Sequence, residues 1–248
     1  MKLLVSAVGI GIAALLVAAP ARAEFQIGLY GGWNGTHNSD VTFTGPGTNW
    51  TVQSVPWDGL PFTFDGAAPY YGARVIYWPD SMPHWGLMFD LTHAKVRAKA
   101  DATVNYSGTI NGNPVNGTDQ IGNIFDRLEF TDGFTMLTVN SMYRFEPLGR
   151  FQPYVGAGAG ISIPHVEVTG AGVASGLPTT FDYAYGGFAA QVLAGVDIEV
   201  TRHFSLFTEY KFSWAGINAP LSDSAYRIHT DLFTHHVLFG ASVRFGGN

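Results

Sequence analysis

The sequence predicts an all-β protein, an eight-stranded antiparallel transmembrane (outer-membrane) β-barrel. Three observations support this prediction. The chain begins with an export signal, it then contains eight segments with period-two hydrophobicity, and alternately short and long connections join those segments. Small outer-membrane barrels have this organisation, because strands that alternate between lipid and lumen are linked by short periplasmic turns and longer external loops.

Residues 1–23 have the features of a secretory signal peptide. Lys2 is followed by an apolar stretch from Leu3 to Ala19, and Ala21-Arg22-Ala23 provides a small-residue cleavage site. An apolar stretch this short that ends in such a site is typical of a cleaved signal rather than a membrane anchor. We therefore expect residues 24–248 to form the outer-membrane β-barrel domain.

The composition limits the possible functions. The chain has a formal net charge of −6 and no cysteine, so the sequence predicts no disulfides despite export, and generic nucleic-acid binding is disfavoured. No stretch of about 18 apolar residues follows the signal, so no membrane helix is expected. The 31 glycines and 14% aromatic residues suit a barrel with a small-residue lumen and interfacial aromatic girdles.

The segment from Trp85 to Lys99 gives the clearest indication of a membrane. Every second residue from Trp85 to Leu91 is apolar, and the same row continues through His93 to the basic residues that end at Lys99. Alternate residues of a strand share one face. A soluble protein that buried this face would also have to bury the basic row, which is costly. In a membrane barrel the same face meets lipid tails first and anionic headgroups next.

The first four predicted strands are residues 25–33, 70–78, 85–99 and 125–145. In each of them one face is apolar and the opposite face is small or polar. The residues predicted to face lipid are Phe25, Ile27, Leu29 and Trp33 in the first, Tyr71, Ala73, Val75 and Tyr77 in the second, Trp85, Leu87, Phe89 and Leu91 in the third, and Leu137, Val139, Tyr143 and Phe145 in the fourth.

The last four predicted strands are residues 154–163, 190–199, 206–214 and 236–245. Their alternation is equally regular, and the last strand is rich in aromatic residues. The residues predicted to face lipid are Val155, Ala157, Ala159, Ile161 and Ile163, then Ala190, Val192, Ala194, Val196 and Ile198, then Leu206, Tyr210, Phe212 and Trp214, and finally Val237, Phe239, Ala241, Val243 and Phe245.

Charged residues on the lumen face are of both signs. An eight-stranded barrel is only wide enough for its side chains to fill it. We therefore expect a paired internal network rather than a pore, which argues against porin-like transport. The residues concerned are Arg74, Asp90, Arg144, Asp197, Glu199, Glu209, Lys211 and Arg244.

The connections alternate in length. Residues 79–83, 146–149 and 201–203 are short turns, expected on the periplasmic side. The long polar stretches are interpreted as external loops, and they are residues 36–68, 100–126, 167–182 and 216–231.

Six of the eight histidines fall at or above the outer rim, where a single His is often only an interfacial residue. Counting equal wall lengths places His93 on the third strand and His165 on the fifth at the level of residues 133–135 on the fourth strand between them. Glu129, Asp132 and Glu167 lie near this level. Two imidazoles and a carboxylate suit a divalent first-row metal that activates oxygen or polarises a hydroxyl.

Three stretches resemble the signature segments of the lipid A oxidase family. They are LTHAKV (Leu91 to Val96), FDRLEFTDG (Phe125 to Gly133) followed by LTVN, and PYVGAGAGISIPHVEV (Pro153 to Val168). The resemblance implies an outer-membrane barrel that oxidises the proximal glucosamine of lipid A to 2-aminogluconate, with molecular oxygen as acceptor and a divalent metal ion. The family pattern has His-Asn after the Thr-Asp-Gly, where this chain has Phe134-Thr135.

Site roles follow from this chemistry. We expect His93, His165 and Asp132 as metal ligands, and Glu129, Asp132 and Glu167 as candidate catalytic carboxylates that act as base or further ligand. The remaining assignments are the phosphate contacts Lys95, Arg97, Lys99 and Arg127.

The sequence thus predicts a monomeric oxidase in the outer membrane of a Gram-negative bacterium, whose partners are lipid A or lipopolysaccharide and the surrounding membrane lipids. The main alternative is a non-enzymatic barrel with a structural or adhesive role that binds lipopolysaccharide. A lipid A acyl-chain hydrolase is less well supported, because it would need a Ser next to a His at the rim. His235-His236 is followed by Val237, and His37-Asn38-Ser39 stands alone.

Overall fold

A computed structural model describes residues 23–58, 70–222 and 225–247. The predicted signal peptide lies outside these residues except for Ala23, as does the last part of the predicted first loop. Within the described part of the chain, no helix is long and apolar enough to cross a membrane.

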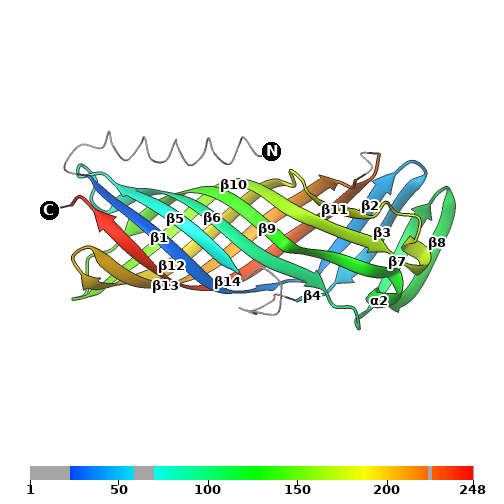
Figure 1. The fold of residues 1–248 in the computed structure, drawn as a ribbon, viewed down its shortest axis with the longest axis horizontal. Helices are drawn as coiled ribbons and strands as arrows, with labels where there is room; N and C mark the ends of the chain where they lie inside the picture. Colours follow the sequence, from blue (N-terminus) through cyan, green and yellow to red (C-terminus); the bar gives the residue numbers. More distant parts are fainter. Residues whose placement is uncertain (1–22, 59–69, 223–224, 248) are drawn as a thin grey trace.

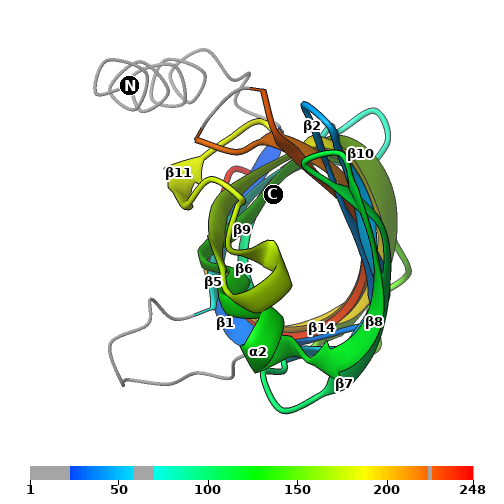
Figure 2. The same cartoon turned by 90° about the vertical axis from the view of Figure 1, so that its right-hand side faces the viewer.

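Eight antiparallel strands form a closed ring, which confirms the predicted fold (Figures 1 and 2). Each strand pairs with the next, and the last pairs with the first from Phe25↔Phe245 to Thr36↔Thr234. The ring strands, in order, are β1 (Glu24–Thr36), β5 (Tyr71–Trp78), β6 (Trp85–Ala98), β9 (Phe125–Arg144), β10 (Phe151–Gly170), β12 (Gly187–Thr201), β13 (Phe204–Pro220) and β14 (Arg227–Phe245).

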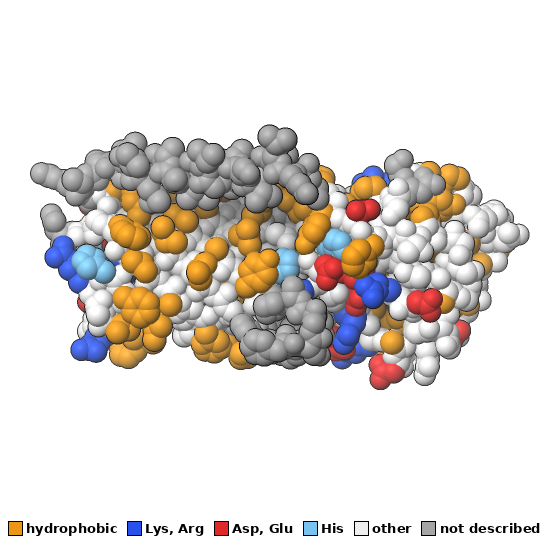
Figure 3. Space-filling model, in the orientation of Figure 1, with side chains coloured by type: hydrophobic (Ala, Val, Ile, Leu, Met, Phe, Trp, Pro, Cys, Tyr) orange, Lys and Arg blue, Asp and Glu red, His pale blue; other side chains and the backbone are white. Residues whose placement is uncertain are grey.

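The predicted outward rows lie on the outside of the ring. Phe89, Val192 and Phe239 are each more than half exposed, and Leu91 and Ile161 are partly exposed. Apolar side chains cover the middle and left-hand part of the barrel in the space-filling view (Figure 3). This many exposed apolar side chains are costly in water and are expected of a barrel surrounded by lipid.

The predicted charge network fills the ring behind this apolar band. The Arg74 guanidinium lies 2.8 Å from Glu209 and 3.4 Å from Asp197, and its carbon is 3.5 Å from the centre of the Phe207 ring. The Lys211 ammonium pairs with the Asp90 carboxylate. Opposite charges that are buried together in this way compensate part of each other's desolvation.

The external stretches are more ordered than predicted. The described parts of 36–68 and 100–126 contain strands that extend the wall beyond the membrane, so their interpretation as loops is wrong for those residues. The added elements are β2 (Ser39–Gly45), β3 (Thr48–Val55), β4 (Trp57–Asp58), β7 (Thr103–Ile110), β8 (Asn113–Gln120), the one-turn helix α2 (Ile121–Ile124), the 3₁₀ turn η1 (Gly172–Ala174) and β11 (Thr180–Tyr183).

The ring strands also run further outward than predicted. Strands β9 and β10 contain 20 residues each, and β13 and β14 extend through most of the predicted loop 216–231. The extended strands pair with the added ones, because β14 pairs with β2, and β10 pairs with β11. Backbone groups that would otherwise lie unpaired at the upper edge are thereby hydrogen-bonded.

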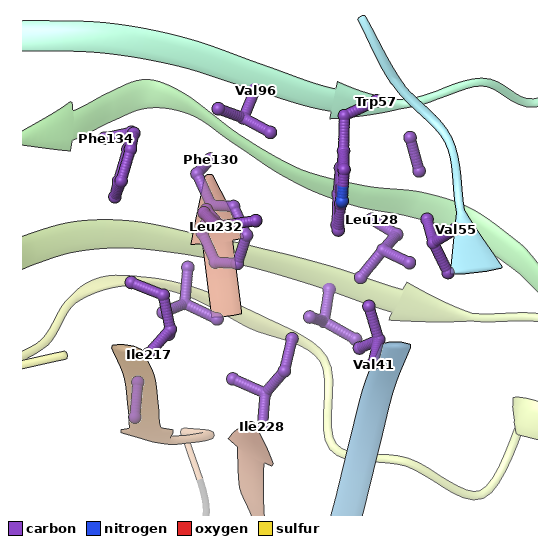
Figure 4. Close-up of a cluster of buried hydrophobic side chains, with 14 of the residues drawn as sticks. Val41, Val55, Trp57, Val96, Leu128, Phe130, Phe134, Ile217, Ile228 and Leu232 are labelled. Atoms are coloured by element: carbon purple, nitrogen blue, oxygen red, sulfur yellow. The ribbon is translucent and has the colours of Figure 1, made fainter. Parts of the chain in front are cut away.

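An apolar core fills the extension above the charge network. Side chains from β2, β3, β6, β9 and β14 meet there, among them the fully buried Phe43, Trp50 and Phe130. Figure 4 shows Phe130, Phe134 and Leu232 pointing into this core. Burial of these rings provides the hydrophobic free energy that holds the extension in place.

Candidate functional site

The site is built around a bulge in strand β9. Between the paired residues Phe130 and Phe134, three residues of β9 (Thr131 to Gly133) lie opposite a single residue of β6, Lys95. The ladder between β9 and β10 is interrupted at the same level. Gly133 has a φ of +144°, a conformation that residues with a Cβ rarely adopt. The backbone groups of the bulge are thus released from the ladder on both sides.

The buried carboxylate of Glu167 binds the released amides. Its Oε1 accepts hydrogen bonds from the backbone N–H of Asp132 (2.8 Å) and of Thr131 (3.1 Å). Its Oε2 accepts one from Arg127 at 2.8 Å. On the other side of the bulge, the Lys95 ammonium donates to the Thr131 carbonyl. Charge-assisted contacts therefore hold the bulge in one conformation.

Three side chains beside the bulge offer a compact set of ligand atoms. One donor atom from each of Asp132, His165 and Glu167 lies within 4.8 Å of the others. Two of them already touch, since His165 Nδ1 is 3.2 Å from Glu167 Oε1. One imidazole and two carboxylates are suitable ligands for a divalent first-row metal.

Strand β11 holds this group in place. The His165 ring contacts the rings of Phe181 and Tyr183 edge-on, at centroid distances of 4.5 and 4.7 Å. The Tyr183 hydroxyl donates to the Asp132 carbonyl at 2.6 Å. β11 therefore fixes both the imidazole and the backbone of the exposed carboxylate.

His93 lies on the opposite side of the bulge and is not part of this three-donor group. Its ring stacks on Tyr71 at 4.4 Å, and its Nδ1 is 3.0 Å from the Thr135 hydroxyl. Gly133 makes room for the ring, because a Cβ there would lie 2.3 Å from His93 Cε1. The buried Nε2 of His93 has no hydrogen-bond partner among the described residues.

The residues of the predicted basic row differ in exposure, because Lys95 is buried whereas Arg97 and Lys99 are exposed. We expected an exposed phosphate contact there, but the side chain is 1% exposed and lies in the wall, because it fills the space opposite the three-residue bulge. Arg97 is exposed and pairs in register with Glu129, while Lys99 forms an exposed ion pair with Asp58 at 3.2 Å.

Among the four predicted phosphate contacts, Arg127 contacts the group of Asp132, His165 and Glu167 directly. Its partly exposed guanidinium contacts Glu167 at 2.8 Å and Glu129 at 3.5 Å. It also lies 5.7 Å from the centre of the Phe181 ring.

Glu129 and Glu167 lie above the apolar band, outside the membrane-spanning part of their strands. Burial and the neighbouring Glu167 charge raise the pKa of the Glu129 carboxyl. Burial also acts to raise the pKa of Glu167, but the Asp132 amide, His165 and Arg127 outweigh it and hold that pKa below its ordinary value. Glu167 is therefore the carboxylate that stays charged, and Glu129 is the one more easily protonated.

The sequence interpretation assigned no role in the site to five residues that shape it, namely Tyr71, Thr131, Thr135, Phe181 and Tyr183. The aromatic pair in β11 carried a usable signal, because Phe181 and Tyr183 alternate as in a short strand. Thr131 carried none, since its contacts depend on the bulge, whereas Thr135 pairs with His93 in the regular part of the ladder.

The position of the site on the barrel is clear from the outside. His and charged side chains gather at the edge of the apolar band in Figure 3, on the side of the extension. On the outer face of the wall, His93 and Thr135 are the next pair outward from the lipid-facing pair Leu91 and Leu137, and Asp132 lies just beyond them. The site therefore faces the layer in which lipid headgroups lie.

Comparison with known proteins agrees with this architecture. The model of the outer membrane protein beta-barrel domain family matches residues 7–245. OprG from Pseudomonas aeruginosa is similar with a TM-score of 0.51 and 14% identity, over 91% of this chain and 97% of OprG. Neisserial surface protein A is similar with a TM-score of 0.45 and 12% identity, over 90% of this chain and 97% of that protein.

At 14% identity the likeness to OprG shows the fold alone. The sequence matches no curated protein. The family match, in contrast, spans nearly the entire chain. The chain therefore belongs to the outer membrane protein beta-barrel domain family and lies in the outer membrane of a Gram-negative bacterium.

Proposed function

We propose that this barrel is a lipid A-modifying oxidase, which oxidises the proximal glucosamine of lipid A to 2-aminogluconate with oxygen. The observation that carries the proposal is the group of donors from Asp132, His165 and Glu167, within 4.8 Å of one another at the edge of the apolar band. The three stretches that resemble lipid A oxidases contribute His93, the β9 bulge and His165 with Glu167. All of these lie around the same bulge.

The donor chemistry fits the divalent metal that the resemblance implies. Asp132, His165 and Glu167 would hold it, and the unpaired Nε2 of His93 is a further candidate once its side chain rotates. A metal bound there would supply Lewis acidity for a sugar hydroxyl and a path for electrons to oxygen.

The reaction removes two electrons and two protons from C1 of the glucosamine and its hydroxyl. Oxygen takes them up as hydrogen peroxide, and the lactone that remains adds water to give the acid. Asp132 is the exposed carboxylate of the group and is our candidate base for the C1 hydroxyl. The partly exposed Arg127, with Arg97 and Lys99, would contact lipid A phosphates, whereas Lys95 holds the bulge.

The departure at Phe134-Thr135 affects this proposal less than its position in the motif suggests. Phe134 is fully buried and points into the core of the extension, away from the outer wall (Figure 4). A His at that position would face the interior. Thr135 faces outward and orients His93 through its hydroxyl.

A non-enzymatic barrel that binds lipopolysaccharide is the second candidate, and one observation favours it. The Glu167 carboxylate already accepts hydrogen bonds from two amides and from Arg127, as expected of a structural group that fastens a bulge. In that case the charged rim would bind headgroups without changing them.

Mass spectrometry of lipid A incubated with the purified protein distinguishes the two candidates. An oxidase adds 16 Da to lipid A and releases hydrogen peroxide, and a strong chelator stops both. Asp132→Asn should abolish most of the conversion, whereas Asp126→Asn, an exposed carboxylate on the same strand, should leave it unchanged.

Unmodified lipid A in the presence of oxygen and added divalent metal would overturn the oxidase proposal. If lipid A still bound to the protein, that result would support the second candidate. Loss of an acyl chain would point instead to hydrolysis.

A further inference from the structure

A second pair of histidines lies on the outer wall, on strands that carry none of the Asp132, His165 and Glu167 donors. His37 follows directly after β1, and its backbone N–H donates to the Phe233 carbonyl of β14 at 2.9 Å. His235 lies on β14 and pairs with Gly35 of β1. Both side chains are exposed. Their Nε2 atoms face each other at 2.7 Å, and their ring centres are 4.8 Å apart.

Strand β13 orients the pair. The Tyr210 hydroxyl lies 2.5 Å from Nδ1 of His235, and the Phe212 ring contacts the His235 ring at 4.9 Å. When Nδ1–H of His235 donates to the Tyr210 oxygen, the lone pair of this imidazole lies on Nε2, directed at His37. Histidines that bind metals commonly have their other ring nitrogen fixed by such a partner.

The two ring nitrogens are close to the separation that a shared metal requires. Two nitrogens that each lie about 2.1 Å from an ion are about 3.4 Å apart in tetrahedral geometry and about 3.0 Å apart at adjacent positions of a square plane. A small rotation of the two exposed side chains would increase the distance between their Nε2 atoms from 2.7 Å to such a separation. Without a metal, the contact requires one ring to donate a proton to the other, and two lone pairs would repel.

We infer that His37 and His235 form a metal site at the outer rim that binds Cu²⁺, Ni²⁺ or Zn²⁺ through the two Nε2 atoms. Imidazole is a preferred ligand of these ions, and Cu²⁺ binds most tightly among them. Among the described residues no third His, Asp or Glu lies close enough to join the pair, so other ligands would complete the coordination. The inference is independent of the proposed oxidase activity, because none of its residues belongs to the β9 bulge.

Cu²⁺ titration of the full purified barrel in detergent tests the inference. A His165→Gln background weakens the donor group at Asp132 and Glu167, so that the His37 site dominates the signal. The electron paramagnetic resonance spectrum should show coupling to two imidazole nitrogens. His37→Gln or His235→Gln should lower Cu²⁺ affinity at least tenfold and leave coupling to one nitrogen. Tyr210→Phe should weaken binding severalfold while both nitrogens remain.

His229→Gln is the matched control, because His229 is an exposed histidine on the same strand β14. It should bind Cu²⁺ as the background does. The inference would be overturned if the background, His37→Gln and His235→Gln bound Cu²⁺ with equal affinity. It would also be overturned if the spectrum of the background showed no coupling to two nitrogens. Folding of each variant is checked by its electrophoretic mobility before and after heating, so that loss of binding is not confused with loss of the barrel.

Discussion

At the scale of single residues, Glu167 connects the stability of the wall with the chemistry of the site. It is fully buried, and its carboxylate accepts hydrogen bonds from the two amides of the bulge and from Arg127. The same carboxylate is one of the three donors that a metal would use. Its structural role can be measured without any substrate.

Glu167→Ala should loosen the bulge. It leaves the amides of Thr131 and Asp132 without their acceptor, and losing a hydrogen bond to a charged group costs about 1.5–3 kcal/mol. Because 1.4 kcal/mol corresponds to a factor of ten, hydrogen exchange of these two amides should accelerate about tenfold or more, while amides in the membrane-spanning part of β9 keep their rates.

Asp126→Ala on the same strand serves as the control, since Asp126 is exposed and lies outside the bulge. Unchanged exchange of the Thr131 and Asp132 amides in Glu167→Ala would contradict the fastening role. The carboxylate would then be available to a metal without structural cost.

At the scale of elements, the bulge of β9 depends on Gly133. This residue has a φ of +144°, and a Cβ there would lie 2.3 Å from the His93 ring, which is itself stacked on Tyr71. Gly133→Ala should therefore destabilise the barrel by about 1–3 kcal/mol, the usual range for a strained backbone position. It should also displace the His93 ring.

The measurements are denaturant unfolding in lipid vesicles and the NMR signal of the His93 imidazole. Gly35→Ala on β1 is the control, because no atom lies within 4 Å of its Cβ position. Its effect should stay within about 0.5 kcal/mol. Equal stability of the two variants, with an unshifted His93 signal, would show that the bulge tolerates a side chain.

The bulge also explains which part of the site the sequence could predict. Alternation places residues correctly as long as the ladder is regular, so Phe89 and Val139 were predicted to face outward and do so. This bulge places three residues of β9 opposite one of β6, so it shifts the register by two residues, and the exposed Asp132 leaves the alternation while Phe130 and Phe134 both still point inward. The burial of Lys95 and the separation of His93 from the three donors therefore could not be read from residue spacing.

The extension was missed for a different reason. Val41, Phe43, Trp50 and Val52 alternate with polar residues as clearly as the membrane strands do, but their apolar face points inward. Period two reveals a strand without revealing which side of it faces the solvent. In a chain rich in Asn and Gly, these short runs between polar residues were interpreted as loops.

At the scale of the whole molecule, the barrel has two levels, and the apolar face of the wall changes from the outside to the inside between them. In the membrane its exterior is apolar and its interior holds ion pairs such as Arg74 with Glu209. In the extension its interior is apolar, and residues such as Thr42 and Asn49 lie toward water. The Asp132, His165 and Glu167 donors lie on the outer wall where these two levels meet.

A substitution that adds a charge to the outer face of the wall should therefore lower the free energy of unfolding by an amount that depends on its depth in the membrane. Val139 lies on β9 in the middle of the lipid-facing row, between Leu137 and Ser141, and is 44% exposed. Val139→Arg should lower the free energy of unfolding by about 2–4 kcal/mol, because the guanidinium would face the bilayer midplane. Asn116→Arg places the same charge on an exposed position of β8, in the extension. It should change that free energy by less than about 1 kcal/mol.

Reversible unfolding in vesicles of a single lipid composition measures both free energies under the same conditions. The difference between the two effects matters more than either value, because a contribution of the unfolded state that both variants share cancels in that difference. If Asn116→Arg cost as much as Val139→Arg, the strands of the extension would also face lipid. The membrane boundary would then have to move outward past the β9 bulge, and Asp132 would lie too deep in the bilayer to meet a headgroup.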